Sequence, residues 1–156
     1  MNTELERAKK SAFSLLKFRV RSKDEISQRL RQKKFPQPII TEVLDFLTDL
    51  GYLDDLAFCL AWISDRQHLK PKSKRLITLE LRKKGVAQEI ISEAFDKAGI
   101  IDDEQLAYDI AVRKYEKLKS LKPDIAGNRL SGFLIRRGFS NSLTYKIVRG
   151  LIENDK

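Results

Sequence analysis

The sequence has few of the residues that cross-link a chain or bind a metal ion. Its 156 residues include one cysteine, Cys59, and one histidine, His68. A single thiol cannot form an internal disulfide, and one cysteine with one histidine cannot supply a four-ligand zinc site. We therefore expect no metal and no cofactor, and we expect the chain to work in a reducing, cytoplasmic setting.

Long apolar runs are also absent. No stretch approaches the roughly 18 consecutive apolar residues that a membrane-spanning helix needs. The opening residues, MNTELERAKKSAF, mix acids and bases without the apolar segment of a secretory signal. The sequence therefore predicts no membrane partner.

Glycine and proline are sparse, with 7 and 4 residues, so turns should be few. Apolar residues recur at helical spacing, as Val43, Leu47 and Leu50 do at i, i+4 and i+7. Ser22 with Glu25 three positions later is typical of a capping box at a helix start. With no alternating β-branched run, the pattern predicts an all-α chain.

Further start and stop signals agree with this prediction. Asp102 and Gln105 have a relation similar to that of Ser22 and Glu25, and Pro123 fits the first turn of a helix. Glycine is favoured just past a helix end because it adopts a positive φ without strain. The glycines that stand where helices should stop are Gly51, Gly85, Gly99 and Gly138.

The sequence repeats itself. ISQRLRQKKF (26–35), ITLELRKKGV (77–86) and LSGFLIRRGF (130–139) align with one another, and two similar joints follow, GYLDD (51–55) and GIIDD (99–103). Each unit reads as helix, turn, helix, turn, helix, and such units gain stability by stacking. The sequence therefore predicts an all-α tandem array of three three-helix repeats, each helix-turn-helix-like, over residues 1–55, 56–103 and 104–156 of one continuous repeat domain.

The chain is strongly basic, with 31 Lys and Arg against 22 Asp and Glu and a formal net charge of +9. Residues 1–35 hold 11 basic and 4 acidic side chains, and residues 66–84 hold 8 basic and 1 acidic. This excess indicates an anionic partner. Nucleic acid, an acidic protein and membrane headgroups all qualify on charge alone.

Basic residues gather on the second helix of each repeat and on the turns beside it. Stacked repeats would align them into one basic stripe, suited to a long, periodic, anionic partner. The simpler alternative is that cations at helix C-termini favour the helix dipole and need no ligand. The expected partner-binding residues are Arg29, Lys33, Lys34, Arg66, Lys74, Arg75, Arg82, Lys83, Lys84, Arg136 and Arg137.

Catalytic motifs are missing. The sequence has no Gly-x-x-x-x-Gly-Lys phosphate loop and no His-Glu-x-x-His. Cys59 lies among apolar residues and is interpreted as a small buried hydrophobe, and His68 as a surface residue. The pairs Asp54-Asp55 and Asp102-Asp103 are interpreted as helix caps rather than as catalytic carboxylates. We therefore expect no catalytic residue and no enzyme.

Two aromatic residues need separate interpretation. Trp62, the single tryptophan, is expected to pack in the core. Tyr52, in the first joint, is consistent either with packing between repeats or with contact to a partner.

These motifs resemble those of a known family. GYLDD followed by Ala57, Phe58 and Arg66, and then by ITLELRKKGVAQEII (77–91), is similar to the RecX family of recombination regulators. The resemblance covers essentially the whole chain and is strongest from residue 22 to residue 95. One departure is the linker KPKSK (70–74), which usually looks glycine-rich in the family and has no glycine here.

The resemblance implies a fold and a function. RecX-like proteins are tandem three-helix repeats without enzymatic activity. They bind along the groove of the RecA–DNA filament, bridge its protomers and hinder filament extension, ATP hydrolysis and strand exchange. Some also contact single- or double-stranded DNA. We expect the chain to act as a monomer on the RecA filament.

Two rival hypotheses remain from the residues themselves. The chain could be a direct DNA-binding protein built from helix-turn-helix-like units. It could also be a helical scaffold for another acidic protein. Steeply salt-dependent binding to naked DNA would favour the first rival.

Overall fold

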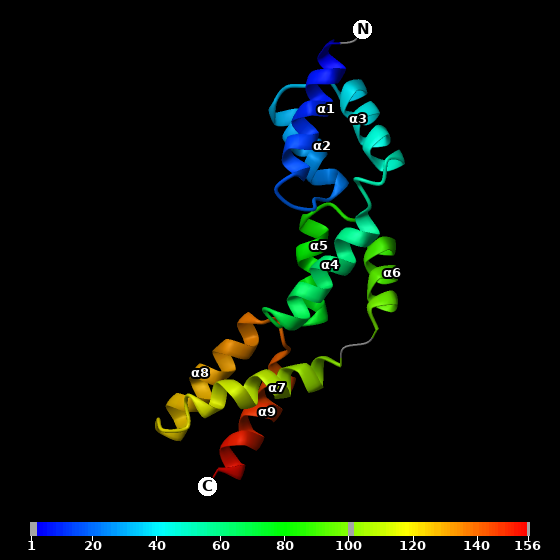
Figure 1. Ribbon diagram of the computed structural model, residues 1–156. Coiled ribbons are helices and arrows are strands. Elements are labelled where there is room, and N and C mark those ends of the chain that lie inside the picture. Colours follow the sequence, from blue (N-terminus) through cyan, green and yellow to red (C-terminus); the bar gives the residue numbers. More distant parts are fainter. Residues whose placement is uncertain (1–2, 100–101, 156) are drawn as a thin grey trace. The chain divides into compact units, whose positions relative to one another are not determined.

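The computed structural model describes residues 3–99 and 102–155, which form nine α-helices and contain no strand (Figure 1). The all-α prediction is confirmed. We refer to α1–α3, α4–α6 and α7–α9 as repeats one, two and three. The helices are α1 (Thr3–Leu16), α2 (Lys23–Gln32), α3 (Gln37–Asp49), α4 (Asp55–His68), α5 (Lys74–Lys83), α6 (Gln88–Ala98), α7 (Asp103–Glu116), α8 (Pro123–Arg136) and α9 (Asn141–Asn154).

The expected helix starts are largely confirmed. The Ser22 hydroxyl accepts a hydrogen bond from the Glu25 amide at 3.1 Å, and the Glu25 carboxylate accepts one from the Ser22 amide at 3.2 Å, which completes the capping box. Pro123 is the first residue of α8.

The start of α7 differs from the expectation in one respect. Asp102 caps α7 through the Glu104 amide at 2.9 Å. The Gln105 side chain does not bond back to Asp102 and instead donates to the Asp109 carboxylate at 2.8 Å. The charged Asp109 carboxylate, one helical turn away, forms a stronger hydrogen bond than the neutral backbone amide of Asp102 would. The Gln105 side chain therefore bonds to Asp109.

The four glycines predicted to end helices all have positive φ angles, between 78° and 91°. Lys34, at φ 66°, follows α2 at the place where Gly85 follows α5 and Gly138 follows α8. A residue with a Cβ is strained in this conformation. The Lys34 side chain is exposed, whereas Gly85 and Gly138 lie against other helices, as the contacts at the ends of α5 and α8 show.

The chain divides into two compact units, residues 1–62 with 80–98 and residues 63–79 with 99–156. The boundary passes through α4 and α5, so the first unit contains repeat one and one end of repeat two. The second unit contains the other end of repeat two and repeat three. The repeat limits 1–55, 56–103 and 104–156 remain a prediction.

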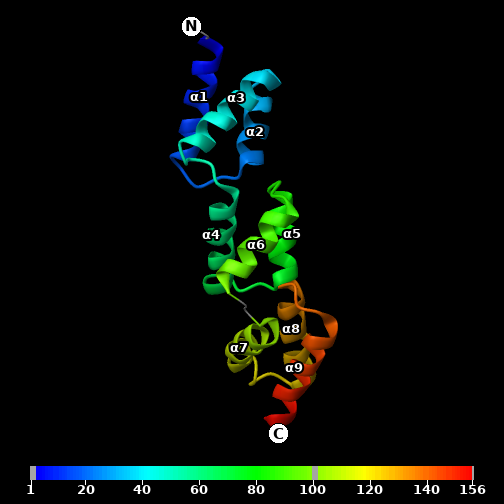
Figure 2. The same ribbon diagram turned by 90° about the vertical axis from the view of Figure 1, so that its right-hand side faces the viewer.

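In the first unit α1, α2 and α3 pack against one another (Figure 2). Their core consists of aliphatic side chains. Ala8 and Ala12 allow α1 to approach the other two helices closely. The larger buried side chains are Ile26, Leu30, Ile39, Ile40, Val43, Leu47 and Leu53. Tyr52 packs edge-on against Phe13, with ring centroids 5.3 Å apart, and stays 56% exposed.

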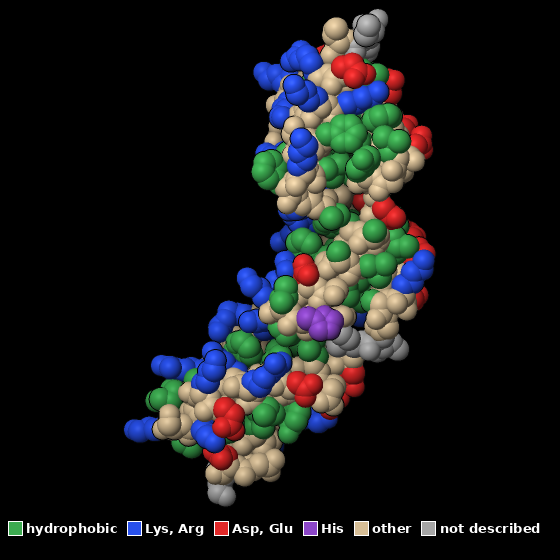
Figure 3. Space-filling view, viewed as in Figure 1, with side chains coloured by type: hydrophobic (Ala, Val, Ile, Leu, Met, Phe, Trp, Pro, Cys, Tyr) green, Lys and Arg blue, Asp and Glu red, His purple; other side chains and the backbone are tan. Residues whose placement is uncertain are grey.

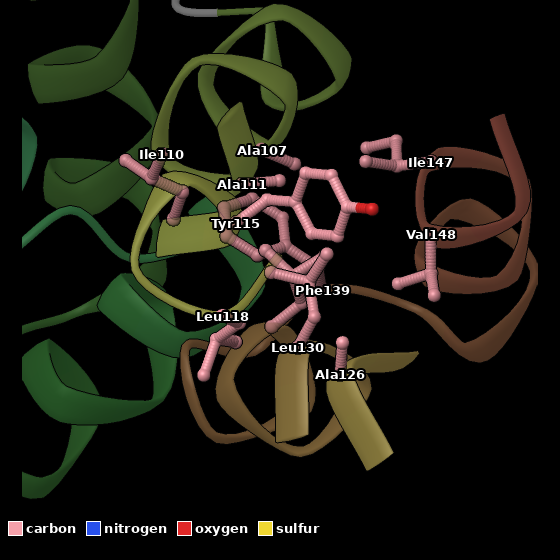
Figure 4. Close-up of a cluster of buried hydrophobic side chains, with 11 residues drawn as sticks. Ala107, Ile110, Ala111, Tyr115, Leu118, Ala126, Leu130, Phe139, Ile147 and Val148 are labelled. Atoms are coloured by element: carbon pink, nitrogen blue, oxygen red, sulfur yellow. The ribbon is translucent and has the colours of Figure 1, made fainter. Parts of the chain in front are cut away.

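In the second unit α7, α8 and α9 enclose a similar core, shown in Figure 4. Leu130 and Leu134 of α8 are fully buried, and Ile147 and Val148 of α9 point into the same cluster. Tyr115, near the end of α7, is the buried aromatic side chain that this helix contributes. The aligned leucines of the repeats, Leu30, Leu81 and Leu134, are all fully buried.

Cys59 is fully buried, as predicted. Trp62 is half-buried rather than a full core residue, and its indole N–H donates to the Glu80 carboxylate at 2.8 Å. A buried indole N–H needs an acceptor, which explains why the ring lies at the edge of the core.

Repeats one and two meet in the first unit, at the start of α2 and the end of α5. The Ser22 hydroxyl donates to the Lys84 carbonyl oxygen at 2.6 Å. The Lys23 amide donates to the Asp55 carboxylate at 2.9 Å. The first residue of α4 therefore caps the N-terminus of α2.

The second unit repeats this arrangement at the start of α5 and the end of α8. The Ser73 amide donates to the Arg137 carbonyl oxygen at 2.8 Å, and the Lys74 amide donates to the Asp103 carboxylate at 3.1 Å. Each Asp-Asp pair therefore has two roles. Asp54 and Asp102 cap their own helices, and the aspartate that follows caps the second helix of the preceding repeat.

Candidate functional site

The predicted partner-binding residues do not share one environment. The exposed ones are Arg29, Lys33, Lys34, Lys74, Arg75, Arg82, Lys83 and Arg136, while Arg66, Lys84 and Arg137 are half-buried. Exposed cations can reach a partner at little cost even where they also bond within the chain, as Arg82 does to the Gln88 side chain, whereas the half-buried ones are partly covered by their own chain. The exposed group is therefore the stronger candidate surface.

Lys84 and Arg137 occupy equivalent places and stabilise the junctions between repeats. The Lys84 ammonium lies 3.6 Å from the Glu25 carboxylate and 5.4 Å from the Trp62 ring centroid. The Arg137 guanidinium donates to the Pro71 carbonyl oxygen at 3.2 Å and lies 5.0 Å from the Phe133 ring centroid. Cation–π contacts of this kind add to the stability of the fold.

In the first unit several cations surround Glu25. Its carboxylate binds Arg19 and lies 4.0 Å from Arg21 as well as close to Lys84. Burial raises the pKa of Glu25, but the hydrogen bonds from Arg19 and Ser22 and the nearby cations outweigh it, so the pKa is lowered overall. Burial also lowers the pKa of Arg21, with Arg19 adding to the effect.

A shallow basic hollow of about 270 Å³ lies beside this carboxylate. Arg29, one of the predicted residues, lines it together with Arg19 and Arg21. The hollow joins the α1–α2 loop to the exposed face of α2. It can accept an anionic group, since three cations line it against a single carboxylate.

In the second unit the junction brings predicted residues from distant parts of the sequence together. The bond from Ser73 to Arg137 places the start of α5 beside the end of α8. Arg75 reaches the Gly138 carbonyl oxygen at 3.5 Å, so Lys74 and Arg75 lie next to Arg136 and Arg137. The result is one basic cluster built from two repeats.

A larger hollow of about 610 Å³ in the second unit contains basic residues that sequence reasoning missed. Arg113 and Lys114 of α7, and Lys117 directly after this helix, line it together with Arg137 and Phe133. Lys114 lies 5.2 Å from the Phe133 ring centroid. The signal that could have found them is the spacing of Arg113 and Lys117, four residues apart on one helix face.

Figure 3 shows how these side chains are distributed over each unit. Over α7 and α8 the Lys and Arg side chains form a nearly continuous group with hydrophobic side chains among them. In the α1–α3 region they lie beside a group of hydrophobic side chains. That the groups of both units form one stripe remains a prediction.

The described residues offer little catalytic chemistry. Within residues 3–99 and 102–155 no three His, Cys, Asp or Glu side chains gather as metal ligands would. Burial, with a contribution from Asp55, raises the pKa of Cys59 to about 11, so its thiol stays protonated at neutral pH. His68 is exposed, as expected, with Nδ1 2.9 Å from the Ser64 carbonyl oxygen. In the part of the chain that is described, no helix has the length and apolar character needed to cross a membrane.

Comparison with known families accounts for all three repeats. Residues 8–47, 54–94 and 102–148 match the family models of the first, second and third three-helix domains of RecX. The chain is 30% identical to the regulatory protein RecX of Streptomyces coelicolor, over 97% of this chain and 80% of that protein. It is 32% identical to the regulatory protein RecX of Mycolicibacterium smegmatis, over 99% of this chain and 84% of that protein.

Solved structures show the same fold. A crystal structure of RecX from Lactobacillus salivarius superposes with a TM-score of 0.76 at 19% identity, covering 97% of this chain and 98% of that one. A second crystal structure of a regulatory protein RecX gives a TM-score of 0.75 at 19% identity, covering 94% and 73% of the two chains. The predicted array of three three-helix repeats is confirmed.

Proposed function

The chain belongs to the RecX family, and we propose that it binds in the groove of the RecA–DNA filament and inhibits filament extension, ATP hydrolysis and strand exchange. On this proposal it regulates recombination without catalysing a reaction, acts as a monomer in the cytoplasm, and uses the exposed cations on its second helices as contacts.

One observation supports the proposal above the others. The second helices of the three repeats each end in exposed basic residues, and the two repeat junctions are built alike, through Lys84 in one and Arg137 in the other. A surface that recurs once per repeat fits a partner that also repeats. A protein–DNA filament is such a partner, and it is anionic along its length.

The repeat construction suggests how inhibition works. Several moderate contacts on one scaffold bind tightly together, because each contact raises the effective concentration of the next. A chain that contacts successive protomers couples subunits that must move during ATP hydrolysis. It therefore slows hydrolysis and blocks the addition of protomers where it lies in the groove.

The test is the DNA-dependent ATPase of a bacterial RecA on single-stranded DNA, titrated with this protein. We expect activity to fall at protein concentrations well below that of the recombinase, since one chain would affect several protomers. An ATPase rate that stays constant up to a molar excess of the protein would contradict the proposal.

A second candidate function is direct binding to DNA. The hollow lined by Arg113, Lys114, Lys117 and Arg137 favours it, because these four cations outnumber Glu116, the acidic residue that lines the same hollow. Lys114 and Arg137 also lie over the ring of Phe133, which lines the hollow as well. Phosphate contacts release counterions, so binding of this kind should weaken steeply as salt rises. Tight, salt-dependent binding to naked DNA without any effect on the RecA ATPase would favour this function over the filament proposal.

A further inference from the structure

The loops that join the first and second helices of repeats one and two share a pattern. Residues 17–23 read KFRVRSK and residues 68–74 read HLKPKSK. Position by position, each has a basic residue or histidine, an apolar residue, a basic residue, an apolar residue, a basic residue, serine and lysine. Phe18 and Leu69 are the apolar residues at the second position.

These two apolar side chains are largely exposed, and Leu69 also lines the hollow beside α7. Phe18 is 85% exposed and Leu69 is 77% exposed, more than any other large hydrophobic side chain in the described ranges. Single exposed apolar residues are common on protein surfaces. Two extreme cases at equivalent positions of two repeats are less readily explained as surface variation.

Both loops form a hydrogen bond to the preceding helix. In repeat one the Arg21 side chain donates to the Leu15 carbonyl oxygen at 3.2 Å. In repeat two the Lys72 amide donates to the Arg66 carbonyl oxygen at 3.0 Å. Arg21 corresponds to Lys72 and Leu15 to Arg66, so both loops bond back to the same position of the preceding helix, through a side chain in repeat one and a backbone amide in repeat two.

Repeat three provides an internal comparison. Its loop also begins with a basic–Leu–basic sequence, Lys117-Leu118-Lys119. Leu118, however, is only 7% exposed and belongs to the core of the second unit. The sequence pattern can therefore bury its apolar residue, and repeats one and two are distinct in presenting theirs.

The chemistry of the tips favours a protein partner over a nucleic acid. Stacking on a base requires a planar π face, which Phe18 has and Leu69 lacks. The property that the tips share is apolarity, which suits insertion into an apolar pocket. The residues around them are cationic, with four basic and no acidic side chains in residues 17–23 and three basic and no acidic in residues 68–74. The pocket should therefore have an acidic rim.

We infer that Phe18 and Leu69 insert into the same apolar, acid-rimmed pocket on different protomers of the RecA filament. This inference rests on the proposed function, because a partner that presents one pocket repeatedly is a polymer. The tips anchor the chain on the filament, while the basic helices supply longer-range attraction. Buried apolar anchors of this kind carry a large share of the affinity at protein interfaces.

The test uses the full chain and RecA filaments formed on single-stranded DNA with a non-hydrolysable ATP analogue. We expect the double variant Phe18→Ser/Leu69→Ser to bind the filament about 30-fold more weakly or worse, as expected when two anchors are lost. Its unfolding midpoint and its affinity for naked single-stranded DNA should stay unchanged. Tyr145→Ser is the matched control, since Tyr145 is 64% exposed and lies outside both loops, and it should bind like the wild type.

A second variant separates apolar insertion from stacking. The exchange Phe18→Leu/Leu69→Phe keeps both tips apolar and should retain filament binding. The inference is overturned if the serine variant binds the filament as the wild type does, or if its affinity for naked single-stranded DNA falls by the same factor. If the wild type itself fails to bind the filament, the proposed function and this inference both fail. If the wild type binds the filament and the serine variant binds it equally well, the proposed function stands and this inference fails.

Discussion

The hydroxyl of Ser22 forms a hydrogen bond with the carbonyl oxygen of Lys84, 62 positions further along the chain, at 2.6 Å. The same oxygen atom of Ser22 accepts the Glu25 amide at the start of α2, and the residue is fully buried. One side chain therefore caps the second helix of repeat one and donates a hydrogen bond to a backbone carbonyl oxygen at the end of the second helix of repeat two.

Ser22→Ala should lower the free energy of unfolding by about 2 kcal/mol, because it removes a helix cap and leaves the Lys84 carbonyl without this donor. Urea unfolding followed by circular dichroism measures the loss. Ser140→Ala is the control: Ser140 caps α9 through the Leu143 amide and is exposed, so only about 1 kcal/mol should be lost. Equal losses would show that the bond to Lys84 contributes nothing.

Gly138→Ala should destabilise the chain by about 2–4 kcal/mol, a range typical of backbone strain combined with overpacking. Gly138 has φ 91°, and a Cβ there would lie 2.4 Å from the Ser73 hydroxyl and 2.6 Å from the Leu76 Cβ. Thermal unfolding gives the loss. At Gly51 φ is 80° but no heavy atom lies within 4 Å of the added Cβ, so Gly51→Ala should cost only about 1 kcal/mol. A Gly138 variant no less stable than the Gly51 variant would contradict the close packing at this junction.

Glu25 should make the free energy of unfolding of the first unit depend on pH in the acidic range. Its pKa in the folded chain lies below the ordinary 4.5, so the folded state binds this proton less readily than the unfolded chain does. The contribution of Glu25 is therefore complete above about pH 4.5 and is lost as the pH falls through the lowered folded value. Glu25→Gln should reduce stability at neutral pH and fall less steeply than the wild type below pH 4.5, as urea titrations at several pH values would show.

The matched control for this titration is Glu104→Gln. Glu104 pairs with Lys146 at 2.7 Å, and both side chains are well exposed. Exposed ion pairs contribute little, so the control should stay within about 1 kcal/mol of the wild type. Parallel curves for the wild type and the Glu25 variant would refute the role assigned to the cations around Glu25.

Arg82→Glu/Lys83→Glu should weaken binding to the RecA filament by about tenfold or more, because both side chains are exposed at the end of α5. Stability should fall only modestly, by about 1–2 kcal/mol, because the change places two acids in the last turn of the helix. The effect should shrink as salt screens the charges. Fluorescence anisotropy with labelled filaments measures the affinity. Lys84→Ala should instead lower the unfolding midpoint, since Lys84 contacts Glu25 and Trp62. Unaltered filament binding by the charge-reversed variant would remove the middle repeat from the proposed surface.

The sequence alone predicted the fold well, because the signals that define it are local. Helical spacing, the Ser22–Glu25 cap and the glycines that end helices each involve residues a few positions apart, and the structure contains all of them. The repeat alignment added the three-helix units. The burial of Cys59 followed from its apolar neighbours in the same helix.

The candidate surface was harder to predict, because contacts between distant segments decide which of its basic side chains are exposed and which are half-buried. Lys83 and Lys84 are adjacent, yet Lys83 is exposed and Lys84 contacts Glu25 from another repeat. Nothing in the local sequence distinguishes them. The same reason explains why Phe18 and Leu118, which follow a lysine in similar loops, differ in exposure.

The capping of each second helix by the next repeat has a consequence for synthesis on the ribosome. The Lys23 amide finds its acceptor in Asp55, 32 residues later, and the Lys74 amide finds its acceptor in Asp103, 29 residues later. When α2 leaves the exit tunnel, the carboxylate that completes its N-terminus has not yet emerged. Repeats one and two are therefore each completed only when the repeat that follows has been synthesised, and these two repeats mature in the order of synthesis.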